Sequence, residues 1–140
     1  MKFRIALIAI FGILALVAQT TKSVWDGVYT DEQAKRGQGL YQKECASCHG
    51  PSMEGGESAP PLTGDAFLAN WNGLTVGDLF DRIRVSMPQD NPGRLSRQQD
   101  ADILAFMMSG NKYPTGKTDL PSQSEVLKQI KIDSPKGGSQ

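Results

Sequence analysis

Three residues within five positions carry the most distinctive chemistry of the sequence: Cys45, Cys48 and His49. On a helical turn, positions three and four residues apart share one face, so both thiols and the imidazole would point the same way. Two neighbouring thiols can form thioether bonds to the two vinyl groups of a haem while the imidazole binds its iron. Cys-x-x-Cys-His is the attachment pattern of c-type haem. The sequence therefore predicts one covalent haem c.

Three other uses of these residues remain open at this point. In an exported protein, Cys45 and Cys48 could form a disulfide. A thioredoxin-like redox pair is expected beside a βαβ unit, and the sequence shows no such alternation. A structural zinc site needs four nitrogen or sulfur ligands, whereas the whole chain has two cysteines and one histidine. The spacing favours haem over all three.

The candidates for the sixth ligand of the iron can be reduced by elimination. His49 is the only histidine, so two histidines of this chain cannot both bind the iron. Met53 follows His49 by four residues, too few to cross to the other haem face, and Met107 and Met108 lie in an apolar helix pattern where methionine usually packs in the core. Met87 stands at the start of a proline-bounded loop. It is the predicted ligand, and an open site is the alternative.

Residues 1–20 are predicted to be a signal peptide. Lys2 and Arg4 precede an apolar run from Ile5 to Ala18, which has the length of a signal-peptide core and is short for a membrane span. An uncleaved anchor is the alternative. In both cases the rest of the chain is expected to be exported to the periplasm, free or anchored to the inner membrane.

The charge balance argues against a nucleic-acid binder. The 140 residues hold 15 Lys and Arg against 15 Asp and Glu, and loss of residues 1–20 would remove Lys2 and Arg4 and leave a mildly acidic protein. The remaining residues are predicted to form one domain, 21–120, and a partly disordered C-terminal extension, 121–140.

The apolar periodicity and the capping signals predict an all-α domain with long loops. Capping boxes are expected at Thr30 with Gln33 and at Ser96 with Gln99. Residues 50–65 form a loop rich in glycine and proline, and a loop of that length usually wraps something. The predicted helical segments are Asp31 to about Glu44, a turn at Phe67–Asn70, Val76–Val85, Arg97–Ser109 with Gly110 in the C′ position, and a weak helix at Gln123–Ile130.

The stretch from Gln33 to Leu120 resembles the class I monohaem c-type cytochromes. The most specific parts of the likeness are Cys45-x-x-Cys48-His49-Gly50 and Met87-Pro88. The resemblance implies a cytochrome c fold, in which three to five helices and long loops wrap around one covalent haem. It also implies an electron-transfer protein rather than an enzyme, which could be a subunit of an oxidoreductase complex.

The resemblance also implies a crossing of two helices. In the family, a glycine and an aromatic residue on the first helix cross an aromatic residue on the last. Gly37, Tyr41 and Phe106 match these by spacing. Close approach of the two helices would give Gly37 a reason to stand inside a helix despite a cost of about 1 kcal/mol.

Further site residues are implied in the same way. The family's Pro-x-Leu-x-Gly element matches the segment containing Pro60 and Leu62, and the Pro60 carbonyl would accept a hydrogen bond from His49 and fix its tautomer. Trp71 and Arg82 are candidates to reach the haem propionates. The alternative for Trp71 is a core position, and for Arg82 a solvated helix face.

A more specific likeness is to cytochrome domains that accept electrons in bacterial quinoprotein dehydrogenase systems. Its motifs are Trp71-Asn72-Gly73-Leu74-Thr75, Asp78-Leu79-Phe80, Met87-Pro88, Pro92-Gly93 and Asn111-x-Tyr113-Pro114-x-Gly116. This likeness implies redox partner proteins such as a quinoprotein dehydrogenase or a terminal oxidase, and a place in a respiratory chain. A membrane partner is expected only if residues 1–20 are retained.

Two other functions remain open. A haem-based sensor or small peroxidase would keep the sixth position free, but distal acid–base chemistry usually needs a positioned His or Glu, and the chain has no second histidine. A non-catalytic subunit of a redox complex could use the long tail after Lys117 for docking.

Overall fold

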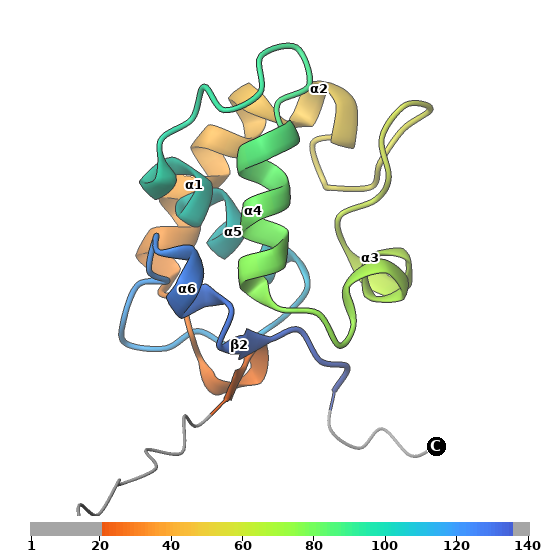
Figure 1. The fold of residues 1–140 in the computed structure, drawn as a ribbon. Helices are drawn as coiled ribbons and strands as arrows, with labels where there is room; N and C mark the ends of the chain where they lie inside the picture. Colours follow the sequence, from red (N-terminus) through yellow and green to blue (C-terminus); the bar gives the residue numbers. More distant parts are fainter. Residues whose placement is uncertain (1–20, 136–140) are drawn as a thin grey trace, which may run out of the picture.

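Six α-helices joined by long loops form the fold of residues 21–135, which are the residues described by the computed structural model (Figure 1). The helices are α1 (Asp31–Glu44), α2 (Ala46–His49), α3 (Gly64–Trp71), α4 (Val76–Ser86), α5 (Arg97–Gly110) and α6 (Ser124–Leu127). A 3-10 helix, η1 (Val24–Asp26), and two short strands, β1 (Lys22–Ser23) and β2 (Ile130–Lys131), complete the described elements. The predicted all-α class is confirmed.

The two longest helices, α1 and α5, cross in direct backbone contact. A Cβ atom on Gly37 of α1 would lie 1.7 Å from the carbonyl oxygen of Asp102 in α5, so only glycine allows this approach. One turn later, the rings of Tyr41 and Phe106 pack with their centroids 5.3 Å apart. Tyr41 is completely buried. The crossing implied by the family resemblance is present.

Of the two predicted capping boxes, one is present in full and the other only in part. Ser96 and Gln99 form the expected capping box of α5, and α4 begins with a similar box. In α1, the Thr30 hydroxyl accepts a hydrogen bond from the Gln33 backbone, but the Gln33 side chain does not return to Thr30. It pairs instead with both backbone groups of Leu120, at 3.0 and 2.6 Å. Only the Thr30 half of the predicted capping box is therefore present. The buried side-chain amide of Gln33 binds Leu120 instead, which is distant in the sequence.

The end of α5 also differs from the prediction. Gly110 is the last helical residue and not the C′ residue, and Asn111 is the C-cap. A Cβ on Gly110 would lie 2.9 Å from the methyl group of Met53. Gly110 therefore lies where side chains of the loop after α2 pack closely against the end of α5, and not where the chain turns.

The C-terminal residues 121–135 pack along the fold. β2 pairs with β1 in parallel, and the Trp25 indole donates a 2.9 Å hydrogen bond to the Asp133 carbonyl. Leu127, Ile130 and Ile132 are buried. The structure does not describe residues 136–140 of the predicted extension, nor the predicted signal peptide at residues 1–20.

No helix between residues 21 and 135 is long and apolar enough to cross a membrane. Figure 1 shows the β1–β2 pair at one end of the molecule and α2 at the other. The chain therefore enters the described fold at the end that is distant from the Cys-x-x-Cys-His segment.

The α1–α5 crossing predicts opposite effects for two glycines of one helix. Gly37→Ala should lower the free energy of unfolding by at least about 2 kcal/mol, because the methyl group would overlap the α5 backbone. Gly39→Ala should raise it by up to about 1 kcal/mol, because a Cβ there meets no atom within 4 Å and alanine favours helix. Denaturant unfolding of the two variants measures both. Equal effects would contradict the crossing geometry.

Candidate cofactor site

Two cysteines and a histidine are held on one turn at the end of α1. Cys45 caps both α1 and α2, and the backbone N–H groups of Cys48 and His49 both donate to its carbonyl, at 3.2 and 3.0 Å. Cys45 is half-buried, with its thiol pKa raised to about 11 chiefly by burial, and Cys48 is exposed. Both thiols are free, so the structure lacks the disulfide considered as an alternative.

The His49 imidazole is buried and oriented by one hydrogen bond. Its Nδ1 lies 2.9 Å from the carbonyl oxygen of Pro60. Because a carbonyl only accepts, Nδ1 must carry the proton, and the lone pair of the neutral ring then lies on Nε2. This is the tautomer that a metal-binding histidine needs.

The loop between α2 and α3 is folded back so that Pro60 can reach His49. The Gly55 N–H donates to the His49 carbonyl at 2.7 Å, and the Leu62 N–H donates to the Met53 carbonyl at 2.9 Å. Gly55 has a φ of +80°, and a Cβ there would lie 2.6 Å from the Pro61 nitrogen. The predicted wrapping loop is therefore held by backbone hydrogen bonds to His49 and to Met53.

Tyr41 connects this loop to the helix crossing. Its hydroxyl donates a 2.7 Å hydrogen bond to the carbonyl of Gly50, directly after His49. Burial is the main cause of the raised pKa of this phenol. Through this hydrogen bond, Tyr41 on α1 helps to position the Cys-x-x-Cys-His turn.

Met87 differs from the other methionines of residues 21–135 in its accessibility. Met53, Met107 and Met108 are buried, with at most 4% of each side chain exposed. Met87 is half-buried at the C-cap of α4, where its N–H donates to the Ile83 carbonyl at 2.8 Å, and a cis peptide bond joins it to Pro88. Met87 is therefore the least buried of these four methionines.

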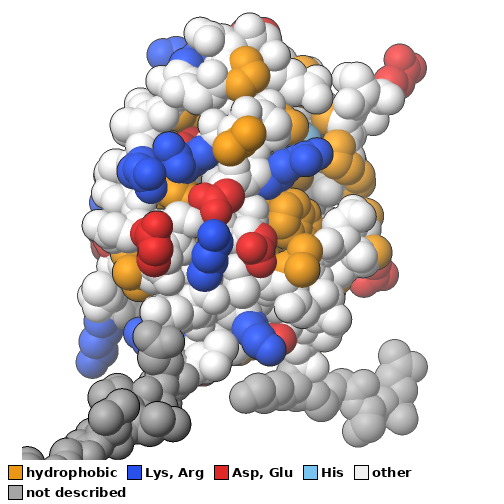
Figure 2. Space-filling model, in the orientation of Figure 1, with side chains coloured by type: hydrophobic (Ala, Val, Ile, Leu, Met, Phe, Trp, Pro, Cys, Tyr) orange, Lys and Arg blue, Asp and Glu red, His pale blue; other side chains and the backbone are white. Residues whose placement is uncertain are grey.

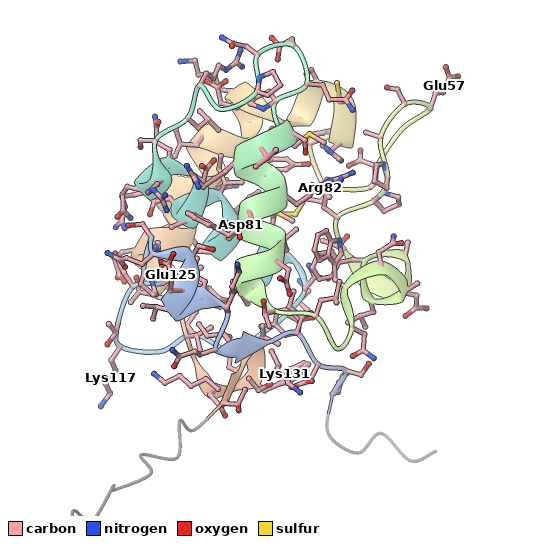
Figure 3. All side chains as sticks on the ribbon, viewed as in Figure 1. Glu57, Asp81, Arg82, Lys117, Glu125 and Lys131 are labelled. Carbon is pink, nitrogen blue, oxygen red and sulfur yellow. The ribbon has the colours of Figure 1, made fainter. Side chains whose placement is uncertain are left out.

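The remaining predicted site residues lie on three different elements. Leu62 in the loop and Trp71 at the end of α3 are half-buried against the core, and Trp71 stacks on Phe67 with centroids 6.5 Å apart. Arg82 is exposed, and Figure 3 shows it directed from α4 toward the side of the molecule where the α2–α3 loop lies. These positions agree with either of the roles considered for Trp71 and Arg82.

Asp100 is a residue of this region that the sequence analysis missed. It is only 1% exposed, and its Oδ1 atom has no hydrogen-bond partner. Burial raises its pKa from 3.8 to about 6, against the opposing effect of Arg84 and Arg97. An acidic residue three and four positions before the buried Ile103 and Leu104 was the available signal, because this spacing places it on the apolar face of α5.

The donor set tests which cofactor fits. Between residues 21 and 135, no three His, Cys, Asp or Glu side chains are grouped so that they could hold a bare metal ion. Two free thiols and an imidazole with an available Nε2 stand on one turn, and a half-buried thioether follows on α4. These groups fit a haem.

Residues 32–107 match the family model described as cytochrome c oxidase, cbb3-type, subunit III. The chain belongs to this family of c-type cytochromes. Its members' cofactor is haem c, and electron transfer is the role of a cytochrome c domain. The resemblance noted in the sequence is therefore confirmed.

One solved structure is similar to the cytochrome over most of its length. A chain of the sulfane dehydrogenase SoxCD from Paracoccus pantotrophus is 24% identical to it with a TM-score of 0.51. The alignment covers 77% of the cytochrome and 61% of the SoxCD chain, so the cytochrome spans about three-fifths of that chain. This likeness supports the cytochrome c fold. No curated protein matches the sequence.

The buried Asp100 predicts a pH-dependent stability. Because its pKa is about 6 in the folded protein and 3.8 ordinarily, the folded state holds the proton more tightly, and this stabilisation is lost as pH rises from about 4 to about 6. Asp100→Asn should flatten that dependence and raise the free energy of unfolding at pH 7 by about 1 to 3 kcal/mol. The exposed Asp65→Asn is the control. Parallel pH profiles for Asp100→Asn and the unmodified protein would contradict the assignment.

Proposed function

We propose that this cytochrome is a periplasmic one-electron carrier with a single haem c bound through Cys45 and Cys48 and ligated by His49 and Met87. The observation that carries the proposal is the His49–Pro60 hydrogen bond of 2.9 Å beside two free thiols. It presents Nε2 of a neutral, fixed imidazole on the turn that bears both attachment points. When bound, haem supplies a couple between ferrous and ferric iron.

The cysteines would attach the cofactor without any redox change of the protein. Each S–H group would add across one vinyl double bond, so that sulfur bonds to carbon and the thiol hydrogen moves to the neighbouring carbon. The exposed Cys48 and the half-buried Cys45 would then lie at different depths. One attachment point would therefore lie at the surface and the other nearer the core.

His49 and Met87 would keep the coordination unchanged during electron transfer. The imidazole is held by the Pro60 carbonyl, and the backbone of Met87 is fixed to α4 through Ile83. A site whose ligands do not move needs little reorganisation when its charge changes. A His/Met ligand pair also raises the reduction potential.

A dehydrogenase is the proposed electron donor and a respiratory acceptor the proposed recipient. SoxCD is by its description a sulfane dehydrogenase, and the motifs after Trp71 resemble the cytochromes of quinoprotein dehydrogenase systems. A quinoprotein dehydrogenase and a terminal oxidase are therefore the partner classes to test. If residues 1–20 were retained as a membrane anchor, β1 would lie nearest the membrane and α2 would face away from it (Figure 1).

Replacement of Met87 tests the ligand assignment. In the haem-loaded protein, Met87→Ala should remove the ferric sulfur–iron charge-transfer band and lower the reduction potential, because the thioether ligand is lost. Met108→Leu is the control, since Met108 is buried in α5 and its replacement keeps the volume. Optical spectra and redox titration measure both effects.

The same experiment separates the carrier from the sensor or peroxidase. A Met87→Ala protein that keeps the spectrum and potential of the unmodified protein would exclude Met87 as a ligand. If the unmodified protein also bound carbon monoxide in the ferrous state, the open-site alternative would replace the proposal.

A further inference from the structure

Two arginines, Arg84 near the end of α4 and Arg97 at the start of α5, lack an ion-pair partner within the described residues. The acidic side chains around them are already engaged. Asp81 binds Lys128 at 3.2 Å and also accepts from the Ser124 hydroxyl, and Arg94 pairs with both Glu44 and Asp90. These arginines therefore form a local excess of positive charge.

Arg84 lies on α4 and Arg97 is the first residue of α5, and these two helices are in contact. Both arginines also lower the pKa of the buried Asp100 carboxyl group, against the larger effect of burial. The Arg84 guanidinium also lies 5.7 Å from the centre of the Phe80 ring, which restricts its position. The charge is thus presented by packed helices and not by a free loop.

An exposed apolar side chain lies among these charges. Val85 is 76% exposed, more than the other exposed large apolar residues of the described chain, Leu74 at 44% and Val126 at 46%. It stands between Arg84 and the ligand candidate Met87 in sequence. Figure 2 shows an apolar spot between two groups of basic side chains on the face that α4 presents. We call Arg84, Val85 and Arg97 the arginine face.

The composition of this face fits a protein more than a lipid surface. Arginine is enriched in protein–protein interfaces, where lysine is depleted. A single exposed valine is too small an apolar area for membrane insertion. The charge excess selects an acidic partner and would speed its approach.

We propose that the arginine face docks an acidic patch on a redox partner protein. The inference rests on the proposed function, because a partner seated there would lie beside Met87 and hence beside the expected iron. The same chemistry would guide electron entry or exit on the α4 side of the molecule. The lysines at the opposite end of the fold, Lys117 and Lys131, would take no part (Figure 3).

Charge-matched variants of the haem-loaded protein test the electrostatic field of the arginine face. Arg84→Gln with Arg97→Gln should slow oxidation of the ferrous protein by hexacyanoferrate(III), an anion, about threefold or more at low ionic strength and little at high ionic strength. Oxidation by the cation tris(phenanthroline)cobalt(III) should become faster. Lys117→Gln with Lys131→Gln changes net charge equally and is the control. Stopped-flow absorbance gives the rate constants.

Docking is tested with a decaglutamate peptide as the acidic probe. In NMR titrations of the haem-loaded protein, amide shifts should concentrate at residues 82–86 and 97. Val85→Asp should weaken binding about threefold or more, whereas Val126→Asp, at the other exposed valine, should not. Vesicles of phosphatidylglycerol provide the lipid comparison.

The possible outcomes separate the inference from the proposed function. Equal rate changes in the arginine and lysine variants, or peptide shifts centred on Lys117 or Lys131, would overturn the arginine face while leaving a haem-loaded carrier in place. Vesicle binding that is lost in Val85→Asp without any peptide binding would assign the face to a membrane and also overturn it. A protein that takes up no haem would refute the proposed function itself. Its stopped-flow traces would then contain no haem absorbance.

Discussion

The structure depends on the crossing of α1 and α5 at Gly37. No side chain separates the two backbones there, because a Cβ would lie 1.7 Å from the Asp102 carbonyl. The crossing fixes the direction in which α1 ends and so determines where Cys45 begins the next turn. Tyr41 packs on Phe106 in the same contact and reaches the Gly50 carbonyl with its hydroxyl. One close contact thereby sets the position of the attachment turn.

A chain of hydrogen bonds extends this constraint to the iron-binding candidate. Tyr41 holds Gly50, the Gly55 N–H holds the His49 carbonyl, and the Pro60 carbonyl holds His49 Nδ1. Each of these contacts lies in or against a loop that has little regular structure of its own. The imidazole is therefore oriented by the protein, as expected for a ligand that must not move when the charge of its metal changes.

Local patterns in the sequence predicted much of the fold and of the site. The start of α5 depends on residues a few positions apart, and Ser96 and Gln99 predicted it. The α1–α5 contact joins residues that are distant in sequence, and it was predicted from the family resemblance of Gly37, Tyr41 and Phe106. Gln33 and Gly110 were misread because their partners, Leu120 and Met53, are distant in sequence. Asp100 was missed although its spacing from Ile103 and Leu104 places it on the apolar face of α5, because an acidic side chain is ordinarily expected to face solvent.

The central claim is a covalent haem c with His49 and Met87 as ligands. The most direct test is the optical spectrum of the protein produced with haem-maturation machinery, oxidised and reduced, followed by its mass after denaturation. We expect a sharp low-spin reduced spectrum, a far-red sulfur–iron band in the ferric protein, and a mass raised by one haem. A denatured protein with the mass of the polypeptide alone would contradict this claim.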